Sequence, residues 1–403
     1  MKNFLNIQES QIQSDGKDVH LKGINLGGWL LMEGYILHSL NNPVQYFQKE
    51  FTKTLGKQAF EDFEETFLSN FIREEDIQRI AKMGFNCLRV PFHHKLIENK
   101  SYQYSGTGLK YLDRVVRWAK RHKVWVILDL HAACGAQNHD WHSDSDGEAA
   151  LWHNKSYQKR TIRLWEFLAE RYKNERTIAG YDLLNEPVLE DTFLLNQFYR
   201  ELITAIRKVD ANHILFVEGR NWSMDIECLD RFDDANLALS VHFYHPLEYA
   251  FSAIPLLRYP LRSDKGVFDK SAMKRMLKSY VKCAKERKRP IFVGEFGVNY
   301  REGLYGEDKW LGDILSCFEE YGFHWTYWSY KAIKNAIFPD GLFSYRDNPP
   351  WVNRLGPRIG WDNYAVCWPK NKKGMMSSWQ TRNYQENTVL TKVMKEYLKR
   401  GKS

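Results

Sequence analysis

The chain has 403 residues, of which 43% are hydrophobic and 15% aromatic, and its 58 basic and 50 acidic side chains give a formal net charge of +8. This composition can bury a large core, and because the basic residues are dispersed it predicts no nucleic-acid partner. No segment reaches the roughly 18 apolar residues that a membrane span requires, so we expect no membrane partner either.

The N-terminal segment from Met1 to Ser10 lacks the apolar core of a secretory signal. The six cysteines are widely spaced and form no CxxC pair, as expected for reduced thiols. If this N-terminus is native, both features predict a cytoplasmic protein. Between residues 4 and 22, apolar and polar residues alternate around the turn sequence Ser14-Asp-Gly-Lys17, which predicts a β-hairpin.

Eight short apolar runs follow, separated by segments with helical periodicity such as Leu112, Val115, Val116 and Ala119. The runs are Leu21–Leu26, Asn86–Pro91, Val124–Leu130, Ile178–Leu184, Ile214–Glu218, Leu237–Tyr244, Ile291–Phe296 and His324–Tyr330. Eight buried strands with helical returns predict an α/β fold, a closed (β/α)8 TIM barrel, with the N-terminal hairpin as a plug across its bottom.

The excess length of the chain lies after strands, in insertions at about residues 27–70, 131–155, 246–269 and 331–386. We therefore expect one catalytic domain over residues 1–403 with long loops on the C-terminal face, where this architecture builds its substrate site. The last insertion is rich in tryptophan and is expected to be an irregular loop. It either closes one end of the cleft or forms a separate apolar cluster.

Polar side chains of catalytic type stand at nearly every predicted strand end. They are Asn25, Arg89, His131, Asn185, Glu186, His242, Tyr244 and Glu295, and the aromatic Trp328 stands at the end of the last strand. A single such residue is more often a satisfied core group, but a whole set pointing at one rim favours a site. Two of them are carboxylates, which predicts a reaction that needs two carboxyl groups at one bond.

Six motifs in order carry a resemblance. They are Leu88-Arg-Val-Pro91, Asp129-Leu-His131, Leu184-Asn-Glu-Pro187, Val241-His-Phe-Tyr244, Gly294-Glu-Phe-Gly297 and Trp328. Together they resemble glycoside hydrolase family 5, whose members are retaining β-glycosidases on TIM barrels. The resemblance implies that Glu186 is the acid/base and Glu295 the nucleophile.

A retaining enzyme needs its two carboxyls about 5 Å apart, and the ends of the fourth and seventh strands face each other across a barrel mouth. We expect an apolar surrounding or the charge of Glu295 to raise the pKa of Glu186. Arg89 is the expected partner of Glu295, Tyr244 its expected hydrogen-bond donor, and His242 the expected support of Glu186.

The remaining predicted substrate-binding residues are Asn185 for the sugar 2-hydroxyl, His131 for the 3-hydroxyl or as a buttress, and Trp328 as the apolar platform. The loop from His131 to His142, which includes Asn138, resembles the pocket wall of family 5 exo-β-1,3-glucanases. Asn25-Leu-Gly-Gly-Trp29 resembles their first-strand motif. From this motif we expect Trp29 or Glu33 to reach the sugar at the non-reducing end. The alternative is that Trp29 belongs to the core.

Several alternatives stay open. The loop residues His139, Asp140, His142 and Asp144 lack a recognised metal-ligand spacing, so no metal and no cofactor is predicted. Segment Leu247–Leu257 is apolar enough for a lid or for a hydrophobic aglycone, although packing against a neighbouring loop is the simpler interpretation. The sequence predicts an exo-acting β-glycosidase on β-glucosides or short β-glucans. A β-mannosidase, an endo-β-glucanase and a non-catalytic carbohydrate-binding barrel are the alternatives.

Overall fold

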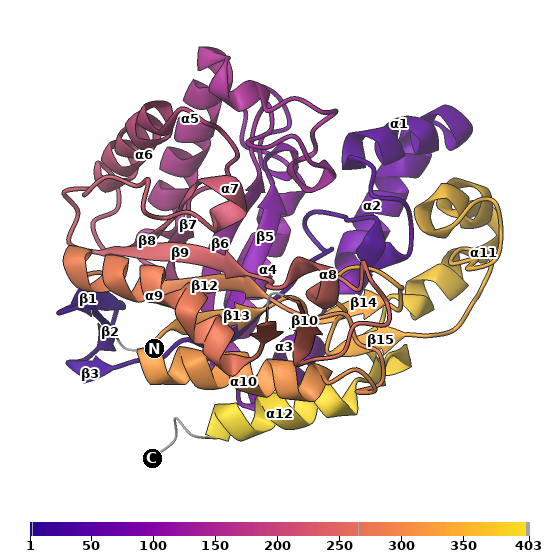
Figure 1. Cartoon of the computed structure of the whole chain (residues 1–403). Helices are drawn as coiled ribbons and strands as arrows, with labels where there is room; N and C mark the ends of the chain where they lie inside the picture. Colours follow the sequence, from indigo (N-terminus) through magenta and orange to yellow (C-terminus); the bar gives the residue numbers. More distant parts are fainter. Residues whose placement is uncertain (2, 265, 400–403) are drawn as a thin grey trace.

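Eight parallel strands close into a barrel, as the sequence predicted (Figure 1). This computed structural model describes residues 1, 3–264 and 266–399. The closed order is β12-β13-β4-β5-β6-β7-β8-β9. The strands are β4 Lys22–Asn25, β5 Cys87–His93, β6 Trp125–Ala132, β7 Ile178–Asp182, β8 Ile214–Glu218, β9 Leu237–Phe243, β12 Ile291–Phe296 and β13 His324–Tyr327. Every predicted apolar run overlaps one strand, because strands buried on both faces are apolar throughout.

Helices return the chain between strands and cover the outside of the barrel. The helices up to the last barrel strand are α1 Val44–Leu55, α2 Lys57–Phe71, α3 Glu74–Met83, α4 Gly108–His122, α5 Lys155–Tyr172, α6 Thr192–Arg207, α7 Arg220–Ser223, α8 Leu247–Ala250, α9 Lys270–Arg287 and α10 Glu307–Tyr321. Two more, α11 Tyr364–Ser378 and α12 Thr388–Lys399, follow the barrel strands. The periodic residues predicted for α4, from Leu112 to Ala119, are buried on its inner face. An apolar stripe of this spacing drives a helix onto a sheet.

The N-terminal segment forms a three-stranded sheet, with β1 Asn6–Gln8, β2 Gln11–Ser14 and β3 Lys17–Asp18. The predicted turn lies between β2 and β3, where Gly16 has a positive φ of 71°. Leu5 and Ile12 pack with Ile214 and Phe292 near the strand starts, in an apolar cluster separate from the main core. The hairpin therefore plugs the barrel at the end opposite the site, as predicted.

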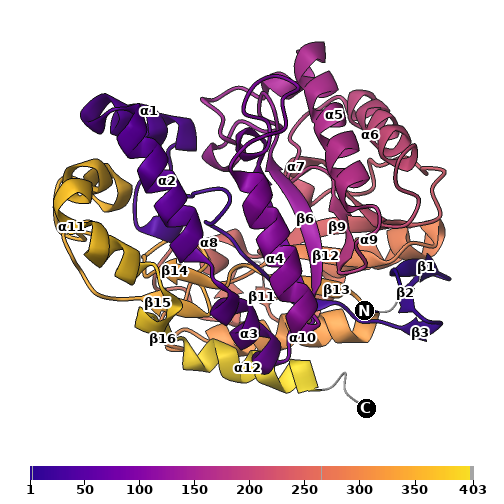
Figure 2. The ribbon, with the colours of Figure 1, turned by 180° about the vertical axis from the view of Figure 1, so that it is seen from behind.

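Segment 331–386 is more regular than expected, because it contains α11, β14 Lys331–Ile333, β15 Phe343–Tyr345 and β16 Gln385–Glu386. Its aromatic rings pack against α1 and α2, which lie beside α11 in both views (Figure 2). Phe47 stacks on Trp361 at 5.2 Å between ring centroids, and Trp379 meets Phe67 edge-on at 5.1 Å. These rings belong to the main core, so the expected separate cluster is wrong, and the tryptophans of the segment do not line the cavity. The segment borders the cavity instead through Phe338 and Pro339, as the alternative prediction expected.

The other two insertions border the barrel mouth. Segment 131–155 contains the short 3-10 helices Trp141–Ser143 and Ala150–Trp152, and segment 246–269 contains α8, β10 Leu261–Ser263 and β11 Gly266–Phe268. Further 3-10 turns lie at Tyr35–Leu37, His94–Leu96, Gly360–Asn363 and Thr381–Asn383. The expected domain of residues 1–403 includes residues 2, 265 and 400–403, which lie outside the described ones. Within the described residues, no helix is both long and apolar enough to cross a membrane.

Candidate active site

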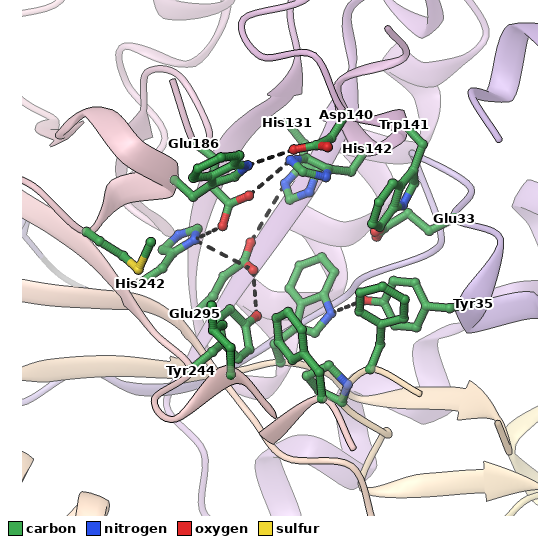
Figure 3. Close-up of a pocket in the computed structure, with 17 residues that line it drawn as sticks. Glu33, Tyr35, His131, Asp140, Trp141, His142, Glu186, His242, Tyr244 and Glu295 are labelled. Atoms are coloured by element: carbon green, nitrogen blue, oxygen red, sulfur yellow. Dashed lines mark hydrogen bonds and ion pairs between the residues drawn. The ribbon is translucent and has the colours of Figure 1, made fainter. Parts of the chain in front are cut away.

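The carboxyl ends of the barrel strands surround a cavity of about 290 Å³, which Figure 3 shows in close-up. Both predicted carboxylates, Glu186 and Glu295, line it, together with His131, Tyr244 and Trp328. A concave site with converging polar groups at this face is where a TIM barrel carries its chemistry.

Glu295 reaches the cavity from a distortion in its strand. The pairing of β12 with β9 shifts register between Val293 and Glu295. The intervening Gly294 leaves room for the histidine next to it, since a Cβ there would lie 3.1 Å from His242 Nε2. A bulge of this kind turns a side chain toward a site. Tyr244 donates its hydroxyl hydrogen to Glu295 Oε2 at 2.7 Å, the contact that the sequence predicted.

Arg89 lies fully buried beneath the cavity and pairs with Glu295 at 2.7 Å, as expected. The guanidinium also donates to Asp182 at 2.8 Å and to Glu218 at 3.1 Å. Burial and the nearby Glu218 hold the pKa of Asp182 well above its ordinary range, against the charge of Arg89, which lowers it. Because Arg89 has no exposed surface, it positions Glu295 and does not bind substrate directly.

The backbone of Glu186 is held from two sides. Its φ is +49°, a left-handed conformation that non-glycine residues rarely adopt and that is often found at functional positions. Its N–H donates to Glu218 Oε2 at 2.6 Å, and its carbonyl accepts from Asn138 Nδ2 at 2.9 Å. These two bonds stabilise the conformation that turns the Glu186 side chain into the cavity.

Two histidines contact the carboxyl group of Glu186. His242 Nδ1 lies 2.7 Å from Oε1, and His142 Nε2 lies 3.0 Å from Oε2. Burial alone would raise the pKa of Glu186, but these hydrogen bonds and the histidine charges outweigh burial and lower it. Burial lowers the pKa of His142, but the hydrogen bond and the charge of Glu186 outweigh burial and raise this pKa to about 9. The expectation of a raised pKa for Glu186 is therefore wrong, because it did not include His142.

One side-chain oxygen of each glutamate and one ring nitrogen of His242 lie within 4.8 Å of one another. This separation fits a retaining glycosidase, whose carboxyls lie about 5 Å apart, and not an inverting one, whose carboxyls lie about 6.5–9.5 Å apart. A metal ion on these three groups would have to displace the hydrogen bonds from His242 to Glu186 and from Tyr244 to Glu295. The donor set thus fits paired carboxylates better than a metal centre.

His131 and Trp328 line the cavity as a stacked pair, with ring centroids 5.4 Å apart and planes 10° from parallel. His131 Nδ1 lies 2.7 Å from Asp129 Oδ2, which fixes the ring. Gly27 makes room for the tryptophan, since a Cβ at this position would lie 2.9 Å from Trp328 Cζ2. Gly27 of the first-strand motif thus provides the space that the indole ring of Trp328 occupies.

Three other predicted binding residues lie behind the cavity wall. Trp29 is a core residue whose indole N–H donates to the carbonyl of Leu68 at 2.8 Å, so its predicted sugar contact is wrong. Asn185 is fully buried and its Oδ1 accepts from Arg89 at 2.9 Å, which does not support the expected contact with a 2-hydroxyl. Asn138, also fully buried, lies 3.0 Å from His142 and positions the loop.

The structure adds residues that the sequence did not single out. Glu218, at the end of β8, joins Arg89, the backbone of Glu186 and His242. Tyr35, Trp141 and Phe338 line the cavity from three separate segments. Only the strand-end position of Glu218 was a usable signal, because loop sequence does not tell which side chain turns inward.

Glu33, which the sequence suggested as an alternative to Trp29, does line the cavity. Its carboxyl is buried, and its Oε1 has no hydrogen-bond partner among the described residues. Burial raises its pKa to about 7, against the charges of His131 and His142, which lower it. An unpartnered buried oxygen in a cavity is suited to accept a bond from a ligand hydroxyl.

The profile of the cellulase family, glycosyl hydrolase family 5, matches residues 46–334, more than half of the chain. A β-xylosidase of Phanerodontia chrysosporium is 32% identical over 343 residues, which cover 80% of this chain and 69% of that protein. Endoglucanase C of Acetivibrio thermocellus is 29% identical over 349 residues, which cover 78% and 92%.

Among solved structures, Cel5A of Thermotoga maritima in complex with cellobiose superposes with a TM-score of 0.63. The match covers 93% of this chain and 97% of that one at 18% identity, a level that supports the barrel fold alone. The sequence similarities carry the assignment further. The chain belongs to glycosyl hydrolase family 5, and it is a hydrolase of O-glycosyl bonds that acts with retention of anomeric configuration.

Proposed function

We propose that the enzyme is an exo-acting β-glycosidase that hydrolyses β-glucosidic bonds in β-glucosides or short β-glucans. Glu295 is the nucleophile and Glu186 is the acid/base. The observation that carries this proposal is the approach of the two carboxyl groups to within 4.8 Å in one cavity. Arg89 and Tyr244 each bind one oxygen of Glu295, so the carboxylate is oriented before substrate arrives.

The reaction proceeds by two displacements at the anomeric carbon. Glu295 attacks this carbon, the bond to the leaving oxygen breaks, and that oxygen takes a proton from Glu186. Water then attacks the same carbon and gives a proton to Glu186, while the ester bond breaks and restores the Glu295 carboxylate. Both steps need a proton that travels through Glu186.

The pair of Glu186 and His142 stores this proton. His142 Nε2 faces the carboxyl at 3.0 Å, but the Asn138 Nδ2 group faces the same ring nitrogen at 3.0 Å. The amide cannot be turned to offer oxygen instead, because its Oδ1 accepts from the Asp140 N–H and its Nδ2 donates to the Glu186 carbonyl. A donor held against Nε2 weakens its hold on the proton, which favours transfer to Glu186 as negative charge develops on the leaving oxygen.

An aromatic wall on one side of the cavity supports exo action. Phe338 contacts Tyr35 at 5.0 Å and Trp141 at 5.5 Å between ring centroids, so three segments of the chain meet in one wall. An endo-acting enzyme needs a groove open at both ends to pass a long chain. Glu33 beside this wall is placed to bind a hydroxyl of a terminal sugar.

The similarity to an endoglucanase keeps endo action as the second candidate, and the similarity to a β-xylosidase keeps the sugar open. A matched panel of aryl β-glucoside, β-mannoside and β-xyloside, followed by laminari- and cello-oligosaccharides, separates sugar preference from linkage preference. We expect the glucoside to be preferred and monosaccharide to be released from chain ends. Release of mixed oligosaccharides from cellohexaose would instead support the endo candidate.

A 2-fluoro sugar with a good leaving group tests the roles of the residues. It should accumulate as an ester on Glu295, identified by mass spectrometry of the digested protein. Label on any other residue would contradict the assignment. If wild type and Glu295→Gln are equally inactive over the whole panel, the barrel only binds carbohydrate.

A further inference from the structure

The cavity is divided by chemistry into two arcs. In the closed strand order, β8 and β9 lie between β7, which precedes Glu186, and β12, which carries Glu295. The segments after these two strands contribute Tyr244, whose hydroxyl is bound to Glu295, and four further residues, Trp222, Met224, Leu247 and Phe251. These four are here called the apolar arc. On the other side of the glutamates, β6 contributes His131, and the segments after β4 and β6 contribute Glu33, Tyr35 and His142. These four are here called the polar arc.

The apolar arc has almost nothing to offer to a hydroxyl group. Leucine and phenylalanine side chains form no hydrogen bonds, and a thioether is a weak acceptor. The only strong donor is the indole N–H of Trp222, which already binds Asp140 Oδ2 at 2.7 Å. A sugar ring enclosed here would leave hydroxyls unpaired, and each buried polar group without a partner is costly.

The arcs correspond to the two sides of the scissile bond. The acetal must lie between Glu186 and Glu295, with the sugar on one side and the leaving group on the other. The polar arc provides Glu33 and His131 for the sugar, so the leaving group faces the apolar arc. Phe251 also contacts Tyr244, the hydrogen-bond partner of Glu295, at 5.1 Å, which brings this arc close to the reacting carbon.

The segment that contributes Leu247 and Phe251 also carries exposed apolar side chains beyond the cavity lining. Leu247 is 37% exposed, Ile254 is 49% exposed and Leu256 is 76% exposed. Exposed apolar side chains are common singly, but several on one segment that also lines a cavity favour a binding surface.

We propose that the natural leaving group is an aliphatic alcohol, so that the substrate is an alkyl β-glycoside whose hydrocarbon chain lies along the apolar arc. This inference rests on the proposed function and names its substrate class. It also gives the segment from Leu247 to Leu257 a role in binding the aglycone in addition to its packing against Phe338.

The test is the dependence of kcat/KM on chain length for the ethyl to hexyl β-glycosides of the preferred sugar. These alcohols are nearly equally basic as leaving groups, so the chemical step stays constant while buried apolar area grows. Burying one methylene is worth about a fourfold gain in kcat/KM. We expect this slope to hold until the chain leaves the cavity. A flat or falling series, or a strong preference for the matching disaccharide, would overturn the inference.

Leu247→Asn should reduce the slope, with the hexyl to ethyl ratio falling at least tenfold. Leu355→Asn is the matched control, since this leucine is 93% exposed and lies outside the cavity lining, and it should keep the wild-type ratio. An equal ratio in all three proteins would also count against the apolar arc. Hydrolysis of an aryl glycoside separates the two proposals, because its complete absence removes the proposed function, whereas a flat alkyl series with aryl activity removes only this inference.

Discussion

Replacing His142 by glutamine should move the alkaline limb of the pH profile of kcat/KM to lower pH. In the wild type the pair of His142 and Glu186 keeps its proton until the pH passes the pKa of His142, which is about 9. Its ordinary value is 6.5, and the raised pKa means that the charged pair is intact below 6.5 and lost as pH rises through 9. In His142→Gln the proton must be held by the carboxyl of Glu186 with His242.

The size of the shift follows from the two proton holders. A carboxylic acid in an enzyme site of this kind commonly has a pKa of about 6, so the alkaline limb should fall from about 9 to about 6. Each pH unit beyond the limb costs a factor of ten in kcat/KM. At pH 8 the variant should therefore retain about one hundredth of its own plateau, whereas the wild type stays on its plateau.

The assay is kcat/KM for an alkyl glycoside from pH 4 to 10, with circular dichroism at each end to show that the variant is folded. His153→Gln is the control, because this histidine belongs to the same loop but is exposed. The groups facing His142 are Glu186, Asp140 and Glu33, with His131 at 6.0 Å between ring centroids. A variant whose alkaline limb stays within half a pH unit of wild type would refute the storage of the proton on this pair.

Three further predictions concern individual side chains. Glu186→Gln should lower kcat/KM for alkyl glycosides about 10²- to 10⁴-fold. The loss for dinitrophenyl glycosides should be much smaller, because only the alkyl alcohol needs a proton to leave. Equal losses for both substrates would argue against Glu186 as the acid. Glu33→Gln should be more stable than wild type above pH 7, because the pKa of Glu33 rises from 4.5 to about 7 in the fold and its ionisation opposes folding. The gain is at most ~3 kcal/mol, it disappears below pH 4, and denaturant unfolding at both pH values measures it. Gly27→Ala should cost about 1–3 kcal/mol by pressing on Trp328, and unchanged unfolding together with unchanged kcat would show that the platform tolerates a methyl group.

The barrel was predictable because its strands are buried on both faces. That environment demands continuous apolar runs, and for β8 and β12 the predicted and observed bounds coincide. The approach of Glu186 to Glu295 followed from the same fact, since parallel strands bring their carboxyl ends to one rim. The N-terminal hairpin was equally clear from its alternation and from the turn at Gly16.

The predictions that failed concern residues whose side-chain positions depend on loop conformation. Trp29 follows a strand end, but Gly28 has a positive φ of 73° and the indole lies in the core against Tyr111. His142 contacts Glu186 only because Asn138 anchors its loop, and a sequence does not state which histidine of a loop turns inward. The helix α11 was missed because Pro369 lies inside it and helical periodicity is weak there.

The ring contacts that join α1 and α2 to the segment around α11 affect how the nascent chain folds. The ribosome delivers Phe47 and Phe67 well before their ring partners Trp361 and Trp379. Until these tryptophans have been made, the aromatic side chains of α1 and α2 that pack against α11 stay exposed to solvent. We therefore expect the nascent chain to bind chaperones. A chain truncated just before α11 should aggregate, although it already contains the cavity residues up to Phe338.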